Sequence, residues 1–188
     1  IKSKSSFMFI LLIGFFYLFS CESSKKHKEY YETGELRIKG EIENNKRVGE
    51  WIAYDKFGGI SNKLFYENDS LCKRFTYVES KLKMEEMLVD SVRDGVLKIY
   101  YDNGKVQSIK TFKNGKDEGL AKEYYSDGTL RVSYVRHDDK IINFEQYFSN
   151  GELFVRAADL DDGINHYSDS LGTRTFDVLY EDGAIVDT

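Results

Sequence analysis

Few residues in this chain have the types and spacing that catalysis or metal binding requires. Segment 136–140 (RHDDK) joins a histidine to two aspartates, but it stands where a turn is expected, so we interpret it as a solvated turn. Segment 159–163 (DLDDG) begins like a calcium loop, yet the twelfth position, which should carry a carboxylate, is Ser170. Cys72 has no histidine nearby, and we interpret it as a small, buried apolar residue. The sequence therefore predicts no catalytic residue, no metal ligand and no cofactor, and a protein that is not an enzyme.

The composition favours β structure and argues against nucleic acid as the partner. Lys and Arg total 27 against 32 for Asp and Glu, a formal net charge of −5, whereas binding to phosphates needs a basic surface. Aromatic residues make up 15% of the chain and are mostly Tyr and Phe, which are enriched in strands. The 15 glycines and the lack of proline predict turns that place glycine or asparagine at positive φ.

The N-terminus has the parts of an export signal. Lys2 and Lys4 precede an apolar run over 7–19, whose thirteen residues would span only about 20 Å as a helix, too short for a membrane. We therefore predict a signal peptide over 1–20, with a helical apolar core. The run ends in LFSC at Cys21, which resembles the lipobox of bacterial lipoproteins. This resemblance implies cleavage before Cys21 and a lipid on its sulfur; an uncleaved hydrophobic anchor or a buried helix stays open as an alternative.

A short phrase built on tyrosine and glycine recurs along the chain. The clearest copies are YYETG, YDKFG, YYDNG, YYSDG and YFSNG, which end at Gly34, Gly58, Gly104, Gly128 and Gly151. The successive steps are 24, 46, 24 and 23 residues, so the long step hides a further copy, in which Tyr77 precedes Lys81 at the glycine place. A last copy, LYEDG, ends at Gly183 after an irregular stretch. Regular steps of this length indicate a repeat architecture.

Each copy is predicted to be a β-hairpin. DNG and SDG form tight turns, because Asn and Gly tolerate positive φ. After the turn at Gly128, the apolar residues Leu130, Val132 and Tyr134 occupy alternate positions, which indicates a half-buried strand. Aliphatic residues stand two places after the turn glycines, at Leu36, Ile60, Val106, Leu130, Leu153 and Ile185. One hairpin cannot bury its apolar face alone, but a row of hairpins can.

We therefore predict an all-β fold, an elongated single-layer antiparallel sheet of stacked β-hairpins preceded by the signal helix. The chain divides into the signal peptide (1–20), a polar tether (21–29) and the hairpin array (30–188), whose last copy is irregular. Lys81 and Asn143 stand where glycines are expected, and they predict local kinks or bulges in their copies.

The pattern of tyrosines, turn glycine and following aliphatic residue resembles the MORN repeat in its bacterial variant form. The clearest copy runs from Tyr100 to Leu130, a second from Tyr30 to Tyr54, and the resemblance extends over about 30–154, with a weaker tail. It implies a flat-to-twisted antiparallel sheet of stacked hairpins. Bacterial members of the family include proteins described as antitoxin components and exported lipoproteins of unknown role.

The doubled tyrosines give the candidate binding residues. The first residue of each pair forms the row Tyr30, Tyr54, Tyr100, Tyr124 and Tyr147, which we interpret as a packed ladder in the core, together with Trp51. Adjacent residues in a strand point to opposite faces. The second members should therefore form an exposed aromatic row suited to a protein or glycan, namely Tyr31, Tyr101, Tyr125 and Phe148.

These observations predict a non-enzymatic, lipid-anchored repeat protein of a bacterial cell envelope, on the periplasmic or outer-membrane face, that presents a sheet surface to a protein partner. The alternative, implied by the resemblance, is an antitoxin or immunity protein that binds and neutralises a toxin. Direct binding of lipid or glycan and a hydrolase activity remain as further alternatives, and the acidic balance disfavours anionic lipids.

Overall fold

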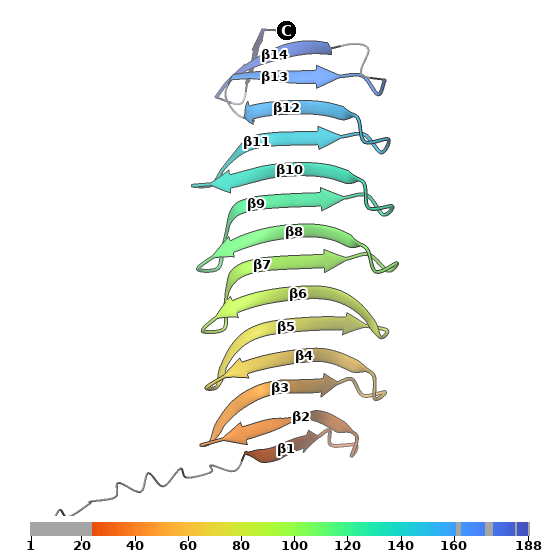
Figure 1. Cartoon of the computed structure of the whole chain (residues 1–188), viewed down its shortest axis with the longest axis vertical. Helices are drawn as coiled ribbons and strands as arrows, with labels where there is room; N and C mark the ends of the chain where they lie inside the picture. Colours follow the sequence, from red (N-terminus) through yellow and green to blue (C-terminus); the bar gives the residue numbers. More distant parts are fainter. Residues whose placement is uncertain (1–23, 161–162, 172–174, 183, 188) are drawn as a thin grey trace, which may run out of the picture.

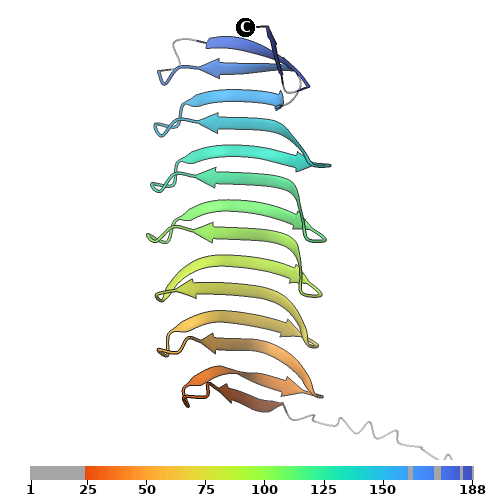
Figure 2. The same ribbon diagram turned by 180° about the vertical axis from the view of Figure 1, so that it is seen from behind.

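The chain folds into one long antiparallel sheet. This computed structural model describes residues 24–160, 163–171, 175–182 and 184–187. Within them, fifteen strands hydrogen-bond in chain order, each antiparallel to the next (Figure 1, and from behind in Figure 2). The strands are β1 (Lys25–Tyr30), β2 (Leu36–Glu43), β3 (Lys46–Tyr54), β4 (Ile60–Glu67), β5 (Ser70–Val78), β6 (Lys81–Val89), β7 (Val92–Tyr100), β8 (Val106–Lys113), β9 (Lys116–Tyr124), β10 (Leu130–His137), β11 (Lys140–Tyr147), β12 (Leu153–Asp159), β13 (Gly163–Ser168), β14 (Thr175–Glu181) and β15 (Ala184–Asp187). The predicted all-β, elongated, single-layer sheet is confirmed.

The N-terminal boundary of the sheet differs from the prediction. The tether predicted for 21–29 is wrong from Lys25 onward, because β1 begins there and pairs with β2, for example through Glu29 and Ile38. An edge strand has a neighbour on one side only and tolerates many polar residues, so its sequence reads like a linker. The signal peptide and Cys21 lie outside the described residues, which contain no helix long and apolar enough to cross a membrane.

Two kinds of connection join the strands. On one side of the sheet, which we call the loop side, a five-residue loop follows the first tyrosine of each of five copies, over 31–35, 55–59, 101–105, 125–129 and 148–152. In the loop over 101–105, the Tyr101 amide donates to the Lys105 carbonyl at 2.9 Å and Gly104 adopts a φ of 80°. The opposite side carries two-residue turns such as Asn44–Asn45, with φ values of 51° and 59°. Positive φ at both central residues is the geometry of tight hairpins, which favours Asn, Asp and Gly.

Both copies that lack an expected glycine keep their place in the array. Near Lys81, a two-residue turn at Glu79–Ser80 replaces the five-residue loop, and Tyr77 pairs with Leu82 as a first tyrosine should. Asn143 takes a φ of 53°, and the β10–β11 register shifts beside it. Register shifts therefore occur in both copies, beside Asn143 and between Thr76 and Tyr77 opposite the start of β6. Copies that keep the glycine shift in the same way, beside Gly49, Gly95 and Gly119, so the missing glycines are not the cause.

The sheet has one buried face, which is marked by an almost continuous row of cross-strand partners. Its members lie directly opposite one another from strand to strand, so they share a face. The row comprises Trp51, Leu64, Arg74, Glu86, Leu97, Lys110, Ala121 and Tyr134, and continues through Phe144, Ala157, Asn165 and Val178. Most of them are buried, including Trp51, as the sequence predicted.

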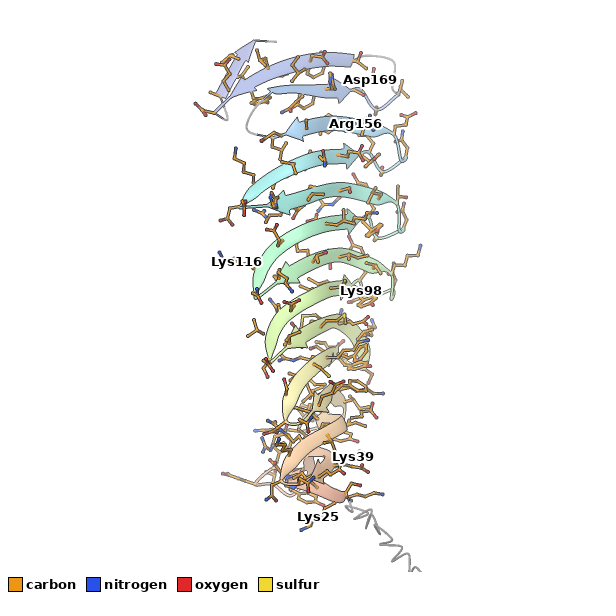
Figure 3. The ribbon with its side chains drawn as sticks, turned by 60° about the vertical axis from the view of Figure 1, so that its left-hand side comes forward. Lys25, Lys39, Lys98, Lys116, Arg156 and Asp169 are labelled. Atoms are coloured by element: carbon orange, nitrogen blue, oxygen red, sulfur yellow. The ribbon has the colours of Figure 1, made fainter. Side chains whose placement is uncertain are left out.

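The opposite face, which we call the charged face, carries a second row that has no fully buried member. Lys39, Lys98 and Arg156, which belong to this row, are labelled in Figure 3. The row passes through Lys28, Lys39, Ile52, Lys63, Phe75, Glu85, Lys98, Ile109, Lys122, Ser133, Glu145, Arg156, His166 and Asp177. Neighbours of opposite sign pair across strands, for example Lys73 with Glu85 at 2.9 Å beside the row. Such pairs contribute little energy at a surface, but they fix where charges lie.

Two landmarks of the repeat prove to be direct partners. The first tyrosine of each copy lies opposite the aliphatic residue that follows the loop, and the same arrangement recurs at Tyr77 and Tyr180. The pairs with five-residue loops are Tyr30–Leu36, Tyr54–Ile60, Tyr100–Val106, Tyr124–Leu130 and Tyr147–Leu153. An aromatic side chain packed on an aliphatic one stabilises a hairpin by up to about 1 kcal/mol. This pairing explains why both residue types recur at each step.

Candidate functional site

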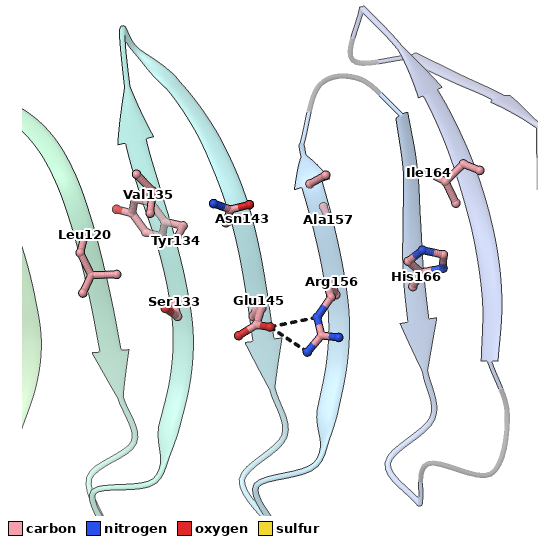
Figure 4. A pocket seen from close by; sticks show the side chains of 11 residues that line it. Leu120, Ser133, Tyr134, Val135, Asn143, Glu145, Arg156, Ala157, Ile164 and His166 are labelled. Carbon is pink, nitrogen blue, oxygen red and sulfur yellow. Dashed lines mark hydrogen bonds and ion pairs between the residues drawn. The ribbon is translucent and has the colours of Figure 1, made fainter.

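A hollow of about 570 Å³ opens on the charged face towards the C-terminal end of the sheet. We call it the β9–β13 hollow, because its lining comes from these five strands (Figure 4). The lining residues are Leu120, Ser133, Tyr134, Val135, Asn143, Glu145, Arg156, Ala157, Ala158, Ile164 and His166. Four consecutive members of the charged row, Ser133, Glu145, Arg156 and His166, cross it.

An ion pair stands in the middle of the hollow. Both Nε and Nη2 of Arg156 contact Oε1 of Glu145, at 2.9 and 2.8 Å (Figure 4). The Tyr147 hydroxyl donates to Oε2 of the same carboxylate at 2.6 Å. These bonds, first that from Tyr147 and then those from Arg156, hold the pKa of Glu145 below its ordinary value despite partial burial. The carboxylate is therefore charged and fixed in position at neutral pH.

The same contact acts on Tyr147 in the opposite direction. Burial and the hydrogen bond to Glu145 raise the pKa of its phenol. Tyr100 repeats this arrangement with Glu85 at 3.0 Å, and burial together with that bond raises the pKa of Tyr100 to about 12. Both phenols remain protonated donors and are not available as bases at neutral pH.

Apolar side chains flank the ion pair. Leu120, from β9, is 45% exposed, and Ile164, from β13, is 52% exposed; they lie on opposite sides of Glu145 and Arg156 (Figure 4). Val135 lies opposite Leu120 and enlarges the apolar surface on that side. An apolar surface around a fixed, neutralised ion pair is typical of a protein contact site.

The chemistry of the hollow does not point to a reaction. His166 contacts Asp177 at 2.6 Å through Nδ1, but within the described part of the chain no hydrogen bond joins it to Ser133. A nucleophile within hydrogen-bond reach of its base is the signature of covalent catalysis. No cluster of three or more His, Cys, Asp or Glu suited to a metal occurs among the described residues. The side chains that line the hollow are therefore suited to binding a partner.

The predicted binding row takes a structural role. Tyr31, Tyr101 and Tyr125 are half-buried, and their hydroxyls donate to the backbone carbonyls of Tyr54, Tyr124 and Tyr147, at 2.7, 2.7 and 2.9 Å. Phe148, without a hydroxyl, packs edge-on against Phe154 at 5.0 Å. The prediction that these four rings form an exposed row on one face of the sheet is wrong, because each is the first residue of a loop. Their role in binding stays a prediction.

The first tyrosines also lie elsewhere than expected. Strand alternation places Tyr54 beside Ile52 and Tyr100 beside Lys98, on the charged face and not in the buried row. They are half-buried, and Tyr30, at the end of the sheet, is exposed. The interpretation of this row as core is therefore wrong. Sequence analysis also missed Glu145 and Arg156, whose only local signal is their place in alternating strands.

Cys72 and segment 136–140 fit their predicted roles more closely. The Cys72 thiol is half-buried and donates to the Phe65 carbonyl at 3.1 Å, as a structural cysteine does. The turn at Asp138–Asp139 is exposed, and His137 contacts Glu118 at 2.8 Å. That contact, followed by the charge of Asp138, raises the pKa of His137.

Three stretches of the chain match the sequence model of one repeat family. Residues 25–44 cover β1 and β2, residues 93–114 cover most of β7 and all of β8, and residues 117–134 cover most of β9 and the first part of β10. The matching family is the MORN repeat variant. The first MORN match begins at Lys25, where β1 also begins, and segment 45–92 between the MORN matches forms hairpins of the same kind. No curated protein matches the chain.

Proposed function

We propose that this chain is a non-enzymatic binding protein and that the β9–β13 hollow receives a protein partner. The observation that carries the proposal is the placement of two exposed aliphatic side chains, Leu120 and Ile164, on either side of the Glu145–Arg156 pair. MORN repeats are in general modules for interaction with proteins or membranes, which supports this class of function.

The hollow offers a partner both affinity and orientation. Covering Leu120 and Ile164 would remove apolar surface from water, at about 25 cal/mol per Å². Nε and Nη2 of Arg156 are directed at Glu145, so a partner gains most by keeping this pair intact or by offering a carboxylate to the remaining N–H groups of the guanidinium. A partner segment with apolar side chains and a hydrogen-bonding group between them fits these requirements.

The test is affinity capture of the full chain from membranes of its own cells, compared between variants. We expect a specific partner to be recovered with the parent and lost with Leu120→Glu combined with Ile164→Glu. Phe57→Glu is the matched control, because Phe57 is exposed in a loop far along the chain from the hollow. Equal recovery of the partner with the parent and the hollow variant would refute the assignment of the site.

The proposal includes a location. We place the chain at a bacterial cell envelope, held there by a lipid on Cys21, as the LFSC motif suggests. Two or more acyl chains are enough for stable anchoring. Cells fed a fatty-acid probe should label the parent and not Cys21→Ala, and equal labelling of both would refute the anchor.

A second candidate function is neutralisation of a toxin enzyme. The overall excess of five negative charges favours a basic partner, such as an enzyme that acts on nucleic acid. If this function holds, a toxin encoded beside the chain should be co-purified by the parent and lose its activity on binding. The Leu120→Glu, Ile164→Glu variant should fail in both respects.

A further inference from the structure

The described sheet is open at both ends. β1 and β15 each have one hydrogen-bonded neighbour in the part of the chain that the structure describes, whereas every strand between them has two. An edge strand presents unpaired N–H and C=O groups that can bind another strand. The two ends lie far apart along the sheet (Figure 1).

Residues at both ends expose apolar surface that is partly covered inside the array. Tyr30 is 57% exposed, whereas Tyr54, Tyr100 and Tyr124, which occupy the same position in later copies, are half-buried. Tyr30 pairs with Leu36 as the others pair with their aliphatic partners, so the difference comes from the position of β1 at the end of the described sheet. At the other end, Ile185 in β15 is 60% exposed.

The two ends carry opposite charge. Lys25, Lys26 and Lys28 on β1 are exposed and have no ion pair in the described part of the chain, and the one acidic residue of β1, Glu29, is already paired with His27 and Arg37. In contrast, residues 175–187, which hold β14 and β15, contain four acidic residues and no Lys or Arg, and one of the four, Asp177, is paired with His166. The end of β14 contributes Glu181, which is exposed.

From these features we infer that the chain associates with itself head to tail, with β1 of one copy adding to β15 of the next. Backbone hydrogen bonds across the new strand pair supply affinity, as in strand addition generally. Charge sets the polarity, because pairing β1 with β1 would oppose lysines, and pairing two acidic ends would oppose carboxylates. A head-to-tail contact does not close on itself unless it turns through a full circle, so it extends the sheet.

Site-directed crosslinking of the full chain in cells tests this inference. One copy carries Lys26→Cys and the other, with a different tag, carries Val186→Cys, both in a Cys72→Ser background. A short bismaleimide should join them into a product that carries both tags. As controls, both tagged copies carry the same variant, either Lys26→Cys or Val186→Cys. Each control should give no more crosslinked product than the Cys72→Ser parent, whose own product measures the background from Cys21.

Two results would overturn the inference. The first is no mixed-tag product above the background. The second is strong product from Lys26→Cys alone or from Val186→Cys alone, because that would mean that like ends meet. The readout does not involve the β9–β13 hollow, so its failure is distinct from failure of the proposed function.

Charge reversal tests the role assigned to the lysines. Adding Lys25→Glu and Lys28→Glu to the Lys26→Cys copy should lower the yield of mixed product by roughly tenfold, and raising the salt concentration should also lower it. Lys116→Glu with Lys140→Glu changes the net charge equally at exposed positions away from β1 and should leave the yield unchanged. Glu181→Lys on the other copy should restore part of the lost yield. If both double variants lower the yield of mixed product equally, the charge argument is refuted.

Discussion

The indole ring of Trp51 lies directly against Gly40 of the neighbouring strand. A Cβ atom on Gly40 would stand 2.1 Å from Cδ2 of that ring, a distance that no side chain can occupy. The copy over 100–124 solves the same packing problem with the sizes reversed, because Lys110 stands where Gly40 does and the buried Ala121 where Trp51 does. Between these two copies, the larger residue changes strand.

Gly40→Ala should destabilise the protein through this contact. Overpacking a tight site costs about 1–3 kcal/mol, so we expect a loss of that size in the free energy of unfolding, measured with guanidinium. In a Trp51→Ala background the added methyl group has room, and the loss should fall below about 1 kcal/mol. An equal loss in both backgrounds would show that the ring is not its cause.

Tyr125→Phe should lower stability by removing the hydrogen bond to the Tyr147 carbonyl. A buried or half-buried hydrogen bond contributes about 0.5–1.5 kcal/mol, and we expect a change within this range by chemical denaturation. Tyr77→Phe is the control, because the half-buried Tyr77 hydroxyl has no hydrogen-bond partner in the described part of the chain. If the two variants lose the same stability, the bond between loops is not significant.

Two variants of the buried ion pair at Glu86 should lose different amounts of stability. It is 2% exposed and contacts Nε of Arg93 at 2.7 Å and Nε of Arg74 at 3.4 Å. Removal of Arg93 leaves a buried carboxylate with one weaker partner, whereas Glu86→Gln leaves two arginines that can reach water. We therefore expect Arg93→Ala to cost about 3 kcal/mol or more and Glu86→Gln about 1–2 kcal/mol, from unfolding curves. The reverse order would contradict the view that burial of the carboxylate dominates.

Glu145 should make stability depend on acid pH. Its pKa is lowered in the folded chain, so it contributes stability that is present above the unfolded pKa of about 4.3 and is lost as the pH falls through the lower folded value. Glu145→Gln should therefore be less stable than the parent near neutral pH, and the difference should shrink below about pH 4. Denaturation at a series of pH values measures it, and a constant difference would argue against the Tyr147 and Arg156 contacts.

The fold follows from the sequence because the repeat step, the turn glycines and the strand alternation agree with one another. The faces of the doubled tyrosines do not follow from the sequence, because alternation holds only where one strand continues through both residues. The structure ends the strand at Tyr100, and Tyr101 already closes the loop, because its backbone N–H donates a hydrogen bond to the Lys105 carbonyl. Local composition does not distinguish a last strand residue from a first loop residue when both are tyrosine.

The candidate site was beyond sequence analysis for a related reason. Glu145 and Arg156 are eleven residues apart, and they meet only because of the register between β11 and β12. That register depends on the loop over 148–152, and the approach of β10 depends on the bulge at Asn143. A shift of one residue would move every side chain of a strand to the other face.

The pairing of strands strictly in chain order has a mechanical consequence. A force that separates the two ends of the sheet acts across its hydrogen bonds, and each strand can peel from its neighbour without disturbing the rest. Stretching should therefore extend the molecule by a series of small, low-force steps, one hairpin at a time, with recovery when tension is released. Such a chain would behave as a spring between whatever holds its two ends.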